Sequence, residues 1–478
     1  MRNRIYGIET EFGCMPPDSD PFLSPDFISV KTKDTVFYSE GLGIVDIHYR
    51  GRDEPPGNGG FLFNGGRLYI DMGHVEYATP ECRGLFDLVA SDRAGEVILQ
   101  RALQQLGLAD DAGFFKNNID HYTGATFGCH ENYLVRRDVP FSEVLLPAIL
   151  PFFVSRQIYA GSGRVGRHTD IFDYGSGDEG EVTFQISQRA DHIVTEIYQW
   201  IQFSRAIINT RDEPLADWGL YRRLHLLVGD SNMSEYATAL KVGTTAMMLE
   251  LLEERIVPDV KLLDPVQAIR DISRDLTCKW EVQLEDDSFT TALEIQRQYL
   301  QLAETYLRGK DPEGDWVLDE WRLVLDALNH DPMALVDRID WVTKKWLLET
   351  VIEAEGVEWN DPWIQSLDLE YHNLNPERGL YHDLRRRGIV RGVVDEQQVD
   401  EAIVKPPADT RARARSTVMR ALTHKSRYVI DWDSIYVEDE KYLNLDDPFL
   451  IYEAETEAFI KECSQPSASP KREGKKVP

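Results

Sequence analysis

Two segments of the sequence alternate polar with apolar residues, and this alternation limits the possible folds more than any other feature. In Arg67-Leu68-Tyr69-Ile70-Asp71 the odd-numbered residues are polar and the even-numbered residues are apolar. Side chains two residues apart on a β-strand lie on the same face of the sheet. The segment therefore predicts a strand with one face in the core and with a guanidinium, a phenol and a carboxylate on the other.

A second such segment, Ile5–Phe12, places Glu9 and Glu11 on one face of a mostly apolar strand. Two carboxylates on one face are costly unless a cation or water lies against them. A Mg²⁺ ion with ATP phosphates would stabilise them, because Mg²⁺ prefers oxygen ligands. An exposed strand face would explain the same pair, so these two residues alone do not decide the chemistry.

The first half of the chain carries further strand-like runs, and the part from residue 234 onward is mainly helical. β-branched and aromatic residues bounded by Gly, Asn or Asp favour strands at 61–72, 126–135, 183–186 and 224–229. The segment 16–60 ends in a cluster of Pro and Gly, which predicts a long loop. Apolar residues at helical spacing predict helices at 235–254, 292–308, 316–329 and 333–351.

The chain is expected to divide into a large and a small domain. Pro406-Pro407 interrupts the helical pattern, and a basic helix at 410–421 followed by a strand at 427–432 indicates a new unit. The predicted parts are a catalytic domain, a small C-terminal domain and a disordered Ser/Pro/Lys-rich tail, at residues 1–405, 406–463 and 464–478.

The charge balance excludes some classes of partner. The 478 residues include 52 Lys and Arg against 82 Asp and Glu, a formal net charge of −30. Coating nucleic acid or an anionic membrane requires neutralisation by basic residues, so neither partner is expected. The sequence has no long apolar run, and its five cysteines are widely spaced without a CxxC motif, which favours reduced thiols in the cytoplasm.

Basic and imidazole side chains gather in several places in this acidic chain. His130, in FGCHENYL, is either a structural histidine or part of a site, and INTRDEP with YRRLH brings Arg211 and His225 into what resembles an anion pocket. Salt bridges to neighbouring carboxylates would also explain these arginines. The arginine clusters 385–387 and 411/413/415 could receive an acidic disordered partner, or could be solvated helix faces.

No phosphate-binding loop, dinucleotide fingerprint or nucleophile elbow occurs in the sequence. If the protein uses ATP, it must do so on an open sheet that carries carboxylates and arginines. That design resembles the glutamine-synthetase-like carboxylate–amine ligases. The predicted fold is therefore α+β, with an antiparallel sheet cradle packed with helices and a small C-terminal domain.

The motifs, taken in order, resemble one family. GIETEFG, FNGGRLYIDMGHVEYATPEC, DRAGE, FKNN, FGCHENYL, INTRDEP, YRRLH, GDSNMSE, KVGT and DWDS follow the order seen in the Pup ligase and Pup deamidase family, over residues 1–450. The resemblance implies ATP and Mg²⁺ as cofactors. It also implies a small, disordered, ubiquitin-like modifier and lysine-bearing substrate proteins as partners.

The resemblance also implies roles for individual residues. Asp71 corresponds to the catalytic base of the family. Three positions resemble Mg²⁺ ligands, namely Glu9, Tyr69 and Glu76. Three others resemble nucleotide contacts, namely Arg67, Thr79 and Trp432.

Two branches of the family remain to be distinguished. GIETEFG, FGCHENYL and ATPEC resemble the ligases, which join the modifier's C-terminal glutamate to a lysine through an acyl phosphate and mark proteins for proteasomal degradation. FFVSRQ and GSGRVG resemble the deamidases and depupylases. The ligase is favoured, with the deamidase as the alternative. A scaffold without catalysis and a generic small-molecule ligase are further alternatives.

Overall fold

A sheet of ten strands forms the centre of the computed structural model, which describes residues 3–17, 20, 22–50, 54–120, 126–167, 182–199, 205–423, 427–438 and 441–465. The strands follow the order β10-β11-β12-β7-β1-β5-β4-β3-β2, and β6 pairs with the far end of β1. Their bounds are β1 Tyr6–Met15, β2 Gly43–Val45, β3 Gly59–Leu62, β4 Arg67–Asp71, β5 His74–Ala78, β6 Gly113–Phe115, β7 Cys129–Arg136, β10 Thr195–Tyr198, β11 Ala206–Asn209 and β12 Tyr221–Leu226.

The two faces of this sheet differ as the alternation predicts. All neighbouring strands pair antiparallel except β10 and β11. Leu68 and Ile70 of β4 lie in an apolar core with Val75 and Tyr77 of β5. Helix α2 (Leu85–Gln105) packs on this face, where Gly95 leaves room for the ring of Tyr77. The opposite face carries the polar side chains.

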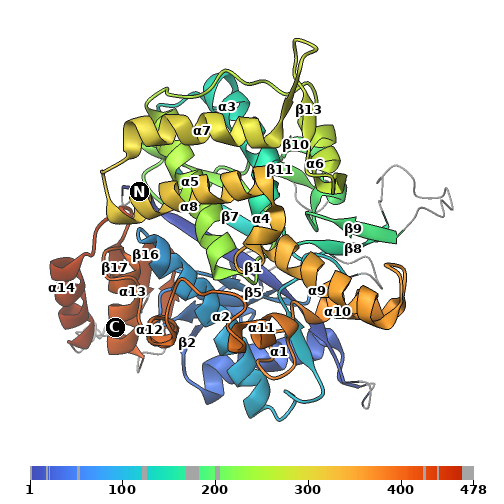
Figure 1. Ribbon diagram of the computed structural model, residues 1–478. Coiled ribbons are helices and arrows are strands. Elements are labelled where there is room, and N and C mark those ends of the chain that lie inside the picture. Colours follow the sequence, from blue (N-terminus) through green and yellow to red (C-terminus); the bar gives the residue numbers. More distant parts are fainter. Residues whose placement is uncertain are drawn as a thin grey trace, which may run out of the picture.

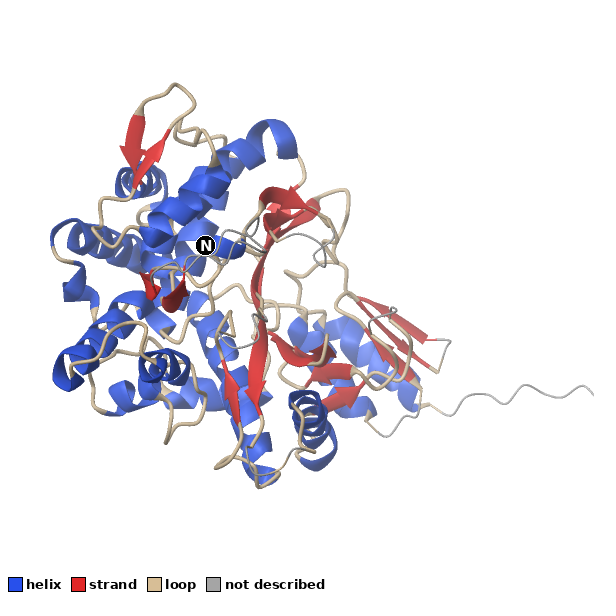
Figure 2. Cartoon of the chain, turned by 90° about the vertical axis from the view of Figure 1, so that its right-hand side faces the viewer, coloured by secondary structure: helices blue, strands red, loops and turns tan. Residues whose placement is uncertain are grey.

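Most helices gather on one side of the long strands, which Figure 2 shows nearly edge-on. Helices α5, α7 and α8 lie together in the upper half of Figure 1, and they share one apolar core with β7 and β12. The helices that follow α2 in this part of the chain are α3 Leu146–Ser155, α4 Gln157–Ala160, α5 Glu235–Glu253, α6 Pro265–Arg274, α7 Ala292–Leu307, α8 Pro312–His330, α9 Asp340–Glu355, α10 Pro362–Glu370, α11 Leu380–Arg386 and α12 Glu396–Val404. The same part of the chain contains two small two-stranded sheets, β8 Arg164–Arg167 with β9 Val182–Gln185, and β13 Glu281–Gln283 with β14 Phe289–Thr291.

The predicted α+β cradle is confirmed, and several predicted elements need correction. The run 61–72 is not one strand, because a turn at 63–66 separates β3 from β4, and Gly65 adopts a φ of +86° there. The segment 16–60 is not a plain loop, because it contains helix α1 (Pro25–Asp34) and strand β2. The stretch 333–351 is a 3₁₀ turn, Pro332–Leu335, followed by α9. Helix α2 was not expected at all.

The C-terminal segment forms a small sheet with two helices, at the lower left of Figure 1. Its elements are α13 Ala412–Leu422, β15 Tyr428–Ile430, β16 Ser434–Val437, β17 Lys441–Asn444 and α14 Glu453–Ser464. They share an apolar cluster with Ile44 and Phe61 of β2 and β3. The domain boundaries expected at 405 and 463 stay predictions, and residues 466–478 of the expected tail lie outside the described part of the chain.

A buried ion pair joins this segment to the central sheet. Glu81, just after β5, accepts hydrogen bonds from Arg411 (2.7 Å) and from both terminal nitrogens of Arg415. Arg411 and Arg415 are 3% and 0% exposed. The hypothesis that the 411/413/415 cluster receives an acidic partner is therefore wrong for these two arginines, because an internal carboxylate already pairs with them.

No helix in the part of the chain that the structure describes combines the length and the apolar character that a membrane span needs.

Loss of the Glu81 ion pair should strongly reduce the free energy of unfolding. Burial alone would raise the pKa of Glu81, but the two guanidinium groups lower it from 4.5 to about 2. We expect Glu81→Gln to reduce the free energy of unfolding by about 3–5 kcal/mol, because two buried arginines lose their counter-ion. Urea unfolding at pH 7 measures this loss.

The Glu81 ion pair should also make the free energy of unfolding depend on pH. The pKa of Glu81 is lower in the folded protein, so its contribution is complete above about pH 4.5 and is lost as the pH falls toward 2. The control is Glu453→Gln, which removes an exposed carboxylate 3.2 Å from Arg413 in the C-terminal segment. Equal stability of the two variants at pH 7 would contradict the assigned role of Glu81.

Candidate active site

The register of five strands brings most of the predicted site residues onto one face of the sheet. Glu9 of β1 lies opposite His130 of β7, and Glu11 lies opposite Glu76 of β5. Glu76 lies in turn opposite Tyr69 of β4. Directly opposed residues of antiparallel strands point to the same side. The polar face is therefore continuous from β4 to β12, and we call it the cradle.

Three carboxylates crowd together at one end of the cradle. Oxygen atoms of Glu11, Asp71 and Glu76 lie within 4.8 Å of one another, and the hydroxyl of Tyr69 donates to Glu76 Oε1 at 2.6 Å. Burial and the charges of Glu11 and Glu9 raise the pKa of Glu76 well above its ordinary value. A cation at this cluster would remove the repulsion, and carboxylate oxygens suit Mg²⁺.

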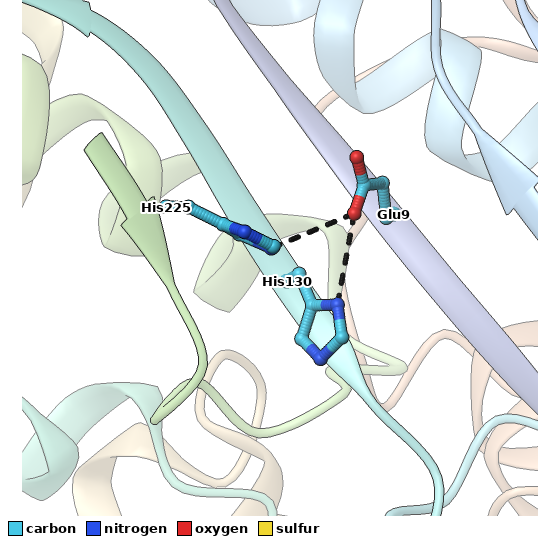
Figure 3. A group of neighbouring side chains, drawn as sticks. All are labelled: Glu9, His130 and His225. Carbon is cyan, nitrogen blue, oxygen red and sulfur yellow. Dashed lines mark ion pairs between the residues drawn. The ribbon is translucent and has the colours of Figure 1, made fainter. Parts of the chain in front are cut away.

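A second cluster combines one carboxylate with two imidazoles from three different strands (Figure 3). Glu9 Oε2 lies 3.6 Å from Nδ1 of His130 and 3.7 Å from Nε2 of His225. Burial lowers the pKa of His225 well below its ordinary value, so its ring is neutral at pH 7. Neither ring nitrogen of His225 has a hydrogen-bond partner among the described residues. These atoms can hold a second divalent cation.

Arg67 is already paired within the protein. Its guanidinium donates to Asp46 at 2.9 Å and to Glu54 at 2.6 Å, and it lies 4.6 Å from the centre of the Tyr69 ring. Burial would lower its pKa, but the two carboxylates raise it. A phosphate that binds Arg67 must therefore compete with Asp46 and Glu54.

A cleft beside the second cluster joins the cradle to the C-terminal segment. Its volume is about 100 Å³, several times the roughly 10–15 Å³ that one water requires. Glu9, Thr79, Arg223 and Trp432 line it. Thr79 Oγ1 accepts a hydrogen bond from the Ile8 amide at 3.1 Å, and the Trp432 ring packs edge-to-face on Phe61 with centroids 5.0 Å apart. Arg67 does not line the cleft.

Comparison with known proteins identifies the family of this arrangement. The family model described as Pup-ligase protein matches residues 4–436. The chain belongs to the Pup ligase family. A Pup–protein ligase of Rhodococcus erythropolis is 38% identical, with 96% of this chain and 99% of the relative covered. A Pup–protein ligase of Nocardia farcinica is 40% identical, with 92% and 94% covered.

The other branch of the Pup ligase family is similar to this chain as well. A Pup deamidase/depupylase of Mycolicibacterium smegmatis is 38% identical, with 90% of this chain and 91% of the relative covered. Among solved structures, the ligase PafA in complex with Pup matches with a TM-score of 0.83 and 34% identity, covering 96% of this chain and 92% of that one. PafA in complex with ADP matches with a TM-score of 0.77 and 33% identity, covering 92% and 94%.

The structure divides the predicted magnesium ligands between the two clusters. Glu9 lies with the histidines, whereas Glu76 lies with Glu11 and Asp71, and Tyr69 contacts Glu76. The charge of Glu9 still reaches Glu76, whose pKa it helps to raise. The assignment of Glu9, Tyr69 and Glu76 as one ligand set therefore stays a prediction.

The sequence pattern missed part of both clusters. Strand parity placed Glu11 on the same face as Glu9 and offered Mg²⁺ for the pair, but Glu11 was not among the assigned ligands. His130 and His225 were named as candidate polar residues and were not assigned to a metal site. The histidines become neighbours of Glu9 only through the pairing of β7 and β12 with β1, which local spacing does not reveal.

Repulsion in the carboxylate cluster predicts that one substitution stabilises the metal-free protein. We expect Glu76→Gln to raise the thermal midpoint in EDTA by a few degrees, because a neutral amide replaces a buried charge beside Glu11 and Asp71. The same variant should gain less stability from added Mg²⁺ than the unchanged protein gains. Thermal unfolding with EDTA and with Mg²⁺ measures both effects. The exposed helical variant Glu401→Gln is the control, and a destabilised metal-free Glu76→Gln would contradict the argument.

Proposed function

We propose that this chain is an ATP-dependent ligase that joins the C-terminal glutamate of the modifier Pup to lysines of other proteins. The observation that carries this proposal is the cradle. On this one face of the sheet lie Asp71, two clusters of side chains that could each bind a cation, and a cleft. The similarity to PafA in complex with Pup, over 96% of this chain, supports Pup as the modifier. The substrate proteins and a cytoplasmic location are part of the same proposal.

The nucleotide and Mg²⁺ have candidate partners in the cradle. Bound Mg²⁺ would neutralise phosphate oxygens, and Glu9, Tyr69 and Glu76 would hold it. Thr79 and Trp432 would contact the nucleotide from the cleft that they line. Arg67 would bind a phosphate after it leaves Asp46 and Glu54, since its fork suits two phosphate oxygens.

Asp71 would supply the base for the second half of the reaction. In the first half, the γ-carboxylate of the modifier's terminal glutamate attacks the γ-phosphate of ATP, which gives an acyl phosphate and ADP. A substrate lysine then attacks the acyl carbon, and inorganic phosphate leaves. Lysine is protonated at pH 7, so a carboxylate that removes its proton is needed beside the reacting carbon.

The deamidase of the same family is the second candidate, because a relative with that name is 38% identical over 90% of this chain. In that reaction the same carboxylate would act on water or on a terminal glutamine amide. ATP would then be bound without being consumed in each turnover. A scaffold without catalysis would leave the carboxylates of the cradle without a use.

Intact-mass measurement separates these functions. The purified protein is incubated with Mg²⁺, ATP, a lysine-bearing protein and Pup that ends in Glu or in Gln. The ligase adds the mass of Pup minus one water to the target and consumes ATP in proportion. Conversion of the Gln form to the Glu form without conjugate or ATP use would instead establish the deamidase. Absence of both products would overturn the proposed activity.

The role of Asp71 predicts a separation of binding from catalysis. We expect Asp71→Asn to bind Mg²⁺ and ADP within a few-fold of the unchanged protein, and to lose at least about 100-fold in conjugation rate. The amide keeps the size of the side chain but cannot accept the proton. Fluorescent-ADP binding and single-turnover conjugation measure the two quantities. Conjugation at the normal rate by Asp71→Asn would show that another group is the base.

A further inference from the structure

A buried arginine at the end of the cradle has no carboxylate at ion-pair distance among the described residues. Arg189 is 6% exposed, and its Nη1 donates to the carbonyl oxygen of Phe127 at 2.9 Å. Its Nε has no hydrogen-bond partner, and no carboxylate lies within 4 Å of its guanidinium among the described residues. A buried guanidinium without a counter-ion is costly to the folded protein.

Most of the other buried arginines among the described residues meet a carboxylate. Arg156 pairs with Glu131, and Arg164 pairs with Asp191 at 2.9 Å. Further examples are Arg4 with Glu253, Arg67 with Asp46, Arg93 with Glu96, and Arg411 and Arg415 with Glu81. Internal pairing is therefore the usual arrangement here, and Arg189 departs from it.

A second guanidinium lies near the first. Arg205 donates to the hydroxyl of Thr126, the residue before Phe127, and no described carboxylate lies within 4 Å of it. Burial lowers the pKa of Arg189, the negative charge of Glu11 opposes this shift, and the positive charge of Arg205 adds to it. Two neighbouring guanidinium groups with no described carboxylate within 4 Å of either form a site for an external anion.

The backbone that carries Arg189 is held rigidly. Asp230, which is 3% exposed, accepts hydrogen bonds from the amides of Ser162 (2.8 Å), Gln188 (2.9 Å) and Arg189 (3.2 Å), and from the hydroxyl of Ser187 (2.9 Å). One buried carboxylate thus orders the turn before Arg189. The guanidinium is therefore placed before any ligand arrives, which reduces the entropic cost of binding.

The site adjoins the carboxylate cluster. Phe127, the contact of Arg189, packs edge-to-face on His74 with ring centroids 4.9 Å apart, and His74 lies opposite Asp71 in the β4–β5 pair. The next residue, Gly128, accepts a hydrogen bond from the Glu11 amide at 3.0 Å. Arg189 therefore lies at the end of the cradle that holds Glu11 and Asp71.

We propose that Arg189, with Arg205 beside it, binds the free α-carboxylate of the modifier's C-terminal glutamate. This assignment rests on the proposed function. The terminal residue carries two carboxylates, and only the γ-carboxylate reacts, so the other needs a separate cationic partner. A bidentate contact to the α-carboxylate leaves the γ-carboxylate directed toward Asp71 and the cation clusters. Recognition of a chain end in this way also excludes internal glutamates from the reaction.

Two synthetic peptides test the assignment by binding alone. Both carry the C-terminal segment of Pup and end in glutamate, but one has a free α-carboxylate and the other an α-carboxamide. Fluorescence anisotropy with Mg²⁺ and ADP measures their affinities for the full chain. We expect the acid to bind about 10- to 100-fold more tightly, as is typical of a charge-assisted hydrogen-bonded pair. Equal affinities would overturn the proposal.

Substitution of Arg189 then shows whether this residue causes the preference. Arg189→Met should bind both peptides equally, with the affinity of the unchanged protein for the carboxamide. Arg189→Lys should keep part of the preference, since it keeps the charge but not the fork. A preference that persists in Arg189→Met would overturn the proposal. So would a loss of ADP affinity with the preference unchanged, which would assign Arg189 to the phosphates.

Stability distinguishes this role from a structural one. Removal of an unpaired buried charge should leave the thermal midpoint of Arg189→Met unchanged or higher, whereas Arg156→Met, which breaks a buried pair, should lower it. If Arg189→Met does not fold, the residue is structural and the proposal fails, unless Arg205→Met folds and loses the preference. Arg322→Met, an exposed substitution on α8, controls for loss of charge.

Failure of the unchanged protein to form conjugate would contradict the proposed function, while the peptide preference would still test this site.

Discussion

Repulsion among the carboxylates on one face of the sheet governs the arrangement of the rest of the site. Strand register forces Glu9, Glu11, Asp71 and Glu76 onto that face, and the core on the other face leaves them no alternative position. Each nearby polar contact reduces the resulting cost. The Tyr69 hydroxyl donates to Glu76, while the imidazoles lie beside Glu9. A bound cation would reduce it further, so metal binding and folding depend on the same residues.

Where the C-terminal segment contacts the sheet, buried positive side chains outnumber the carboxylates. There a single carboxylate, Glu81, meets two buried arginines. Arg415 also donates to the carbonyl of Trp432 at 2.7 Å and to that of Gly65 at 2.8 Å. The position of Trp432, which lines the cleft, thus depends on the ion pair that Glu81 forms just after β5. Glu81 and Arg415, which make this connection, are 334 positions apart in the sequence.

Local sequence patterns predicted the faces of the strands but not their partners. Alternation in β4 was sufficient to place Arg67, Tyr69 and Asp71 together, because parity depends only on the strand itself. The cluster of Glu9 with His130 and His225 depends on pairing across long separations, which no local period encodes. Helix α2 lacks a simple apolar stripe, since its buried residues include Asp92, Arg93 and Glu96. Lys116 pairs with Asp92 and Glu96, so the polar pattern reflects internal ion pairs that only the fold reveals.

In the proposed function one carboxylate cluster would contain both a metal ligand and a base, and the geometry of β4 and β5 is compatible with both roles. A carboxylate bound to a cation has a lower affinity for a proton, so Asp71 can act as a base only when the cation is held by other oxygens. The hydrogen bond from Tyr69 keeps Glu76 on the inner side, where it is 3% exposed. Asp71, in contrast, precedes a tight turn at Met72 and Gly73, both with positive φ (46° and 92°), and Met72 is 79% exposed. Asp71 therefore lies nearer the rim of the cradle than Glu76, and in the proposed function the side chain of a substrate lysine would reach it there while the cation stayed inside.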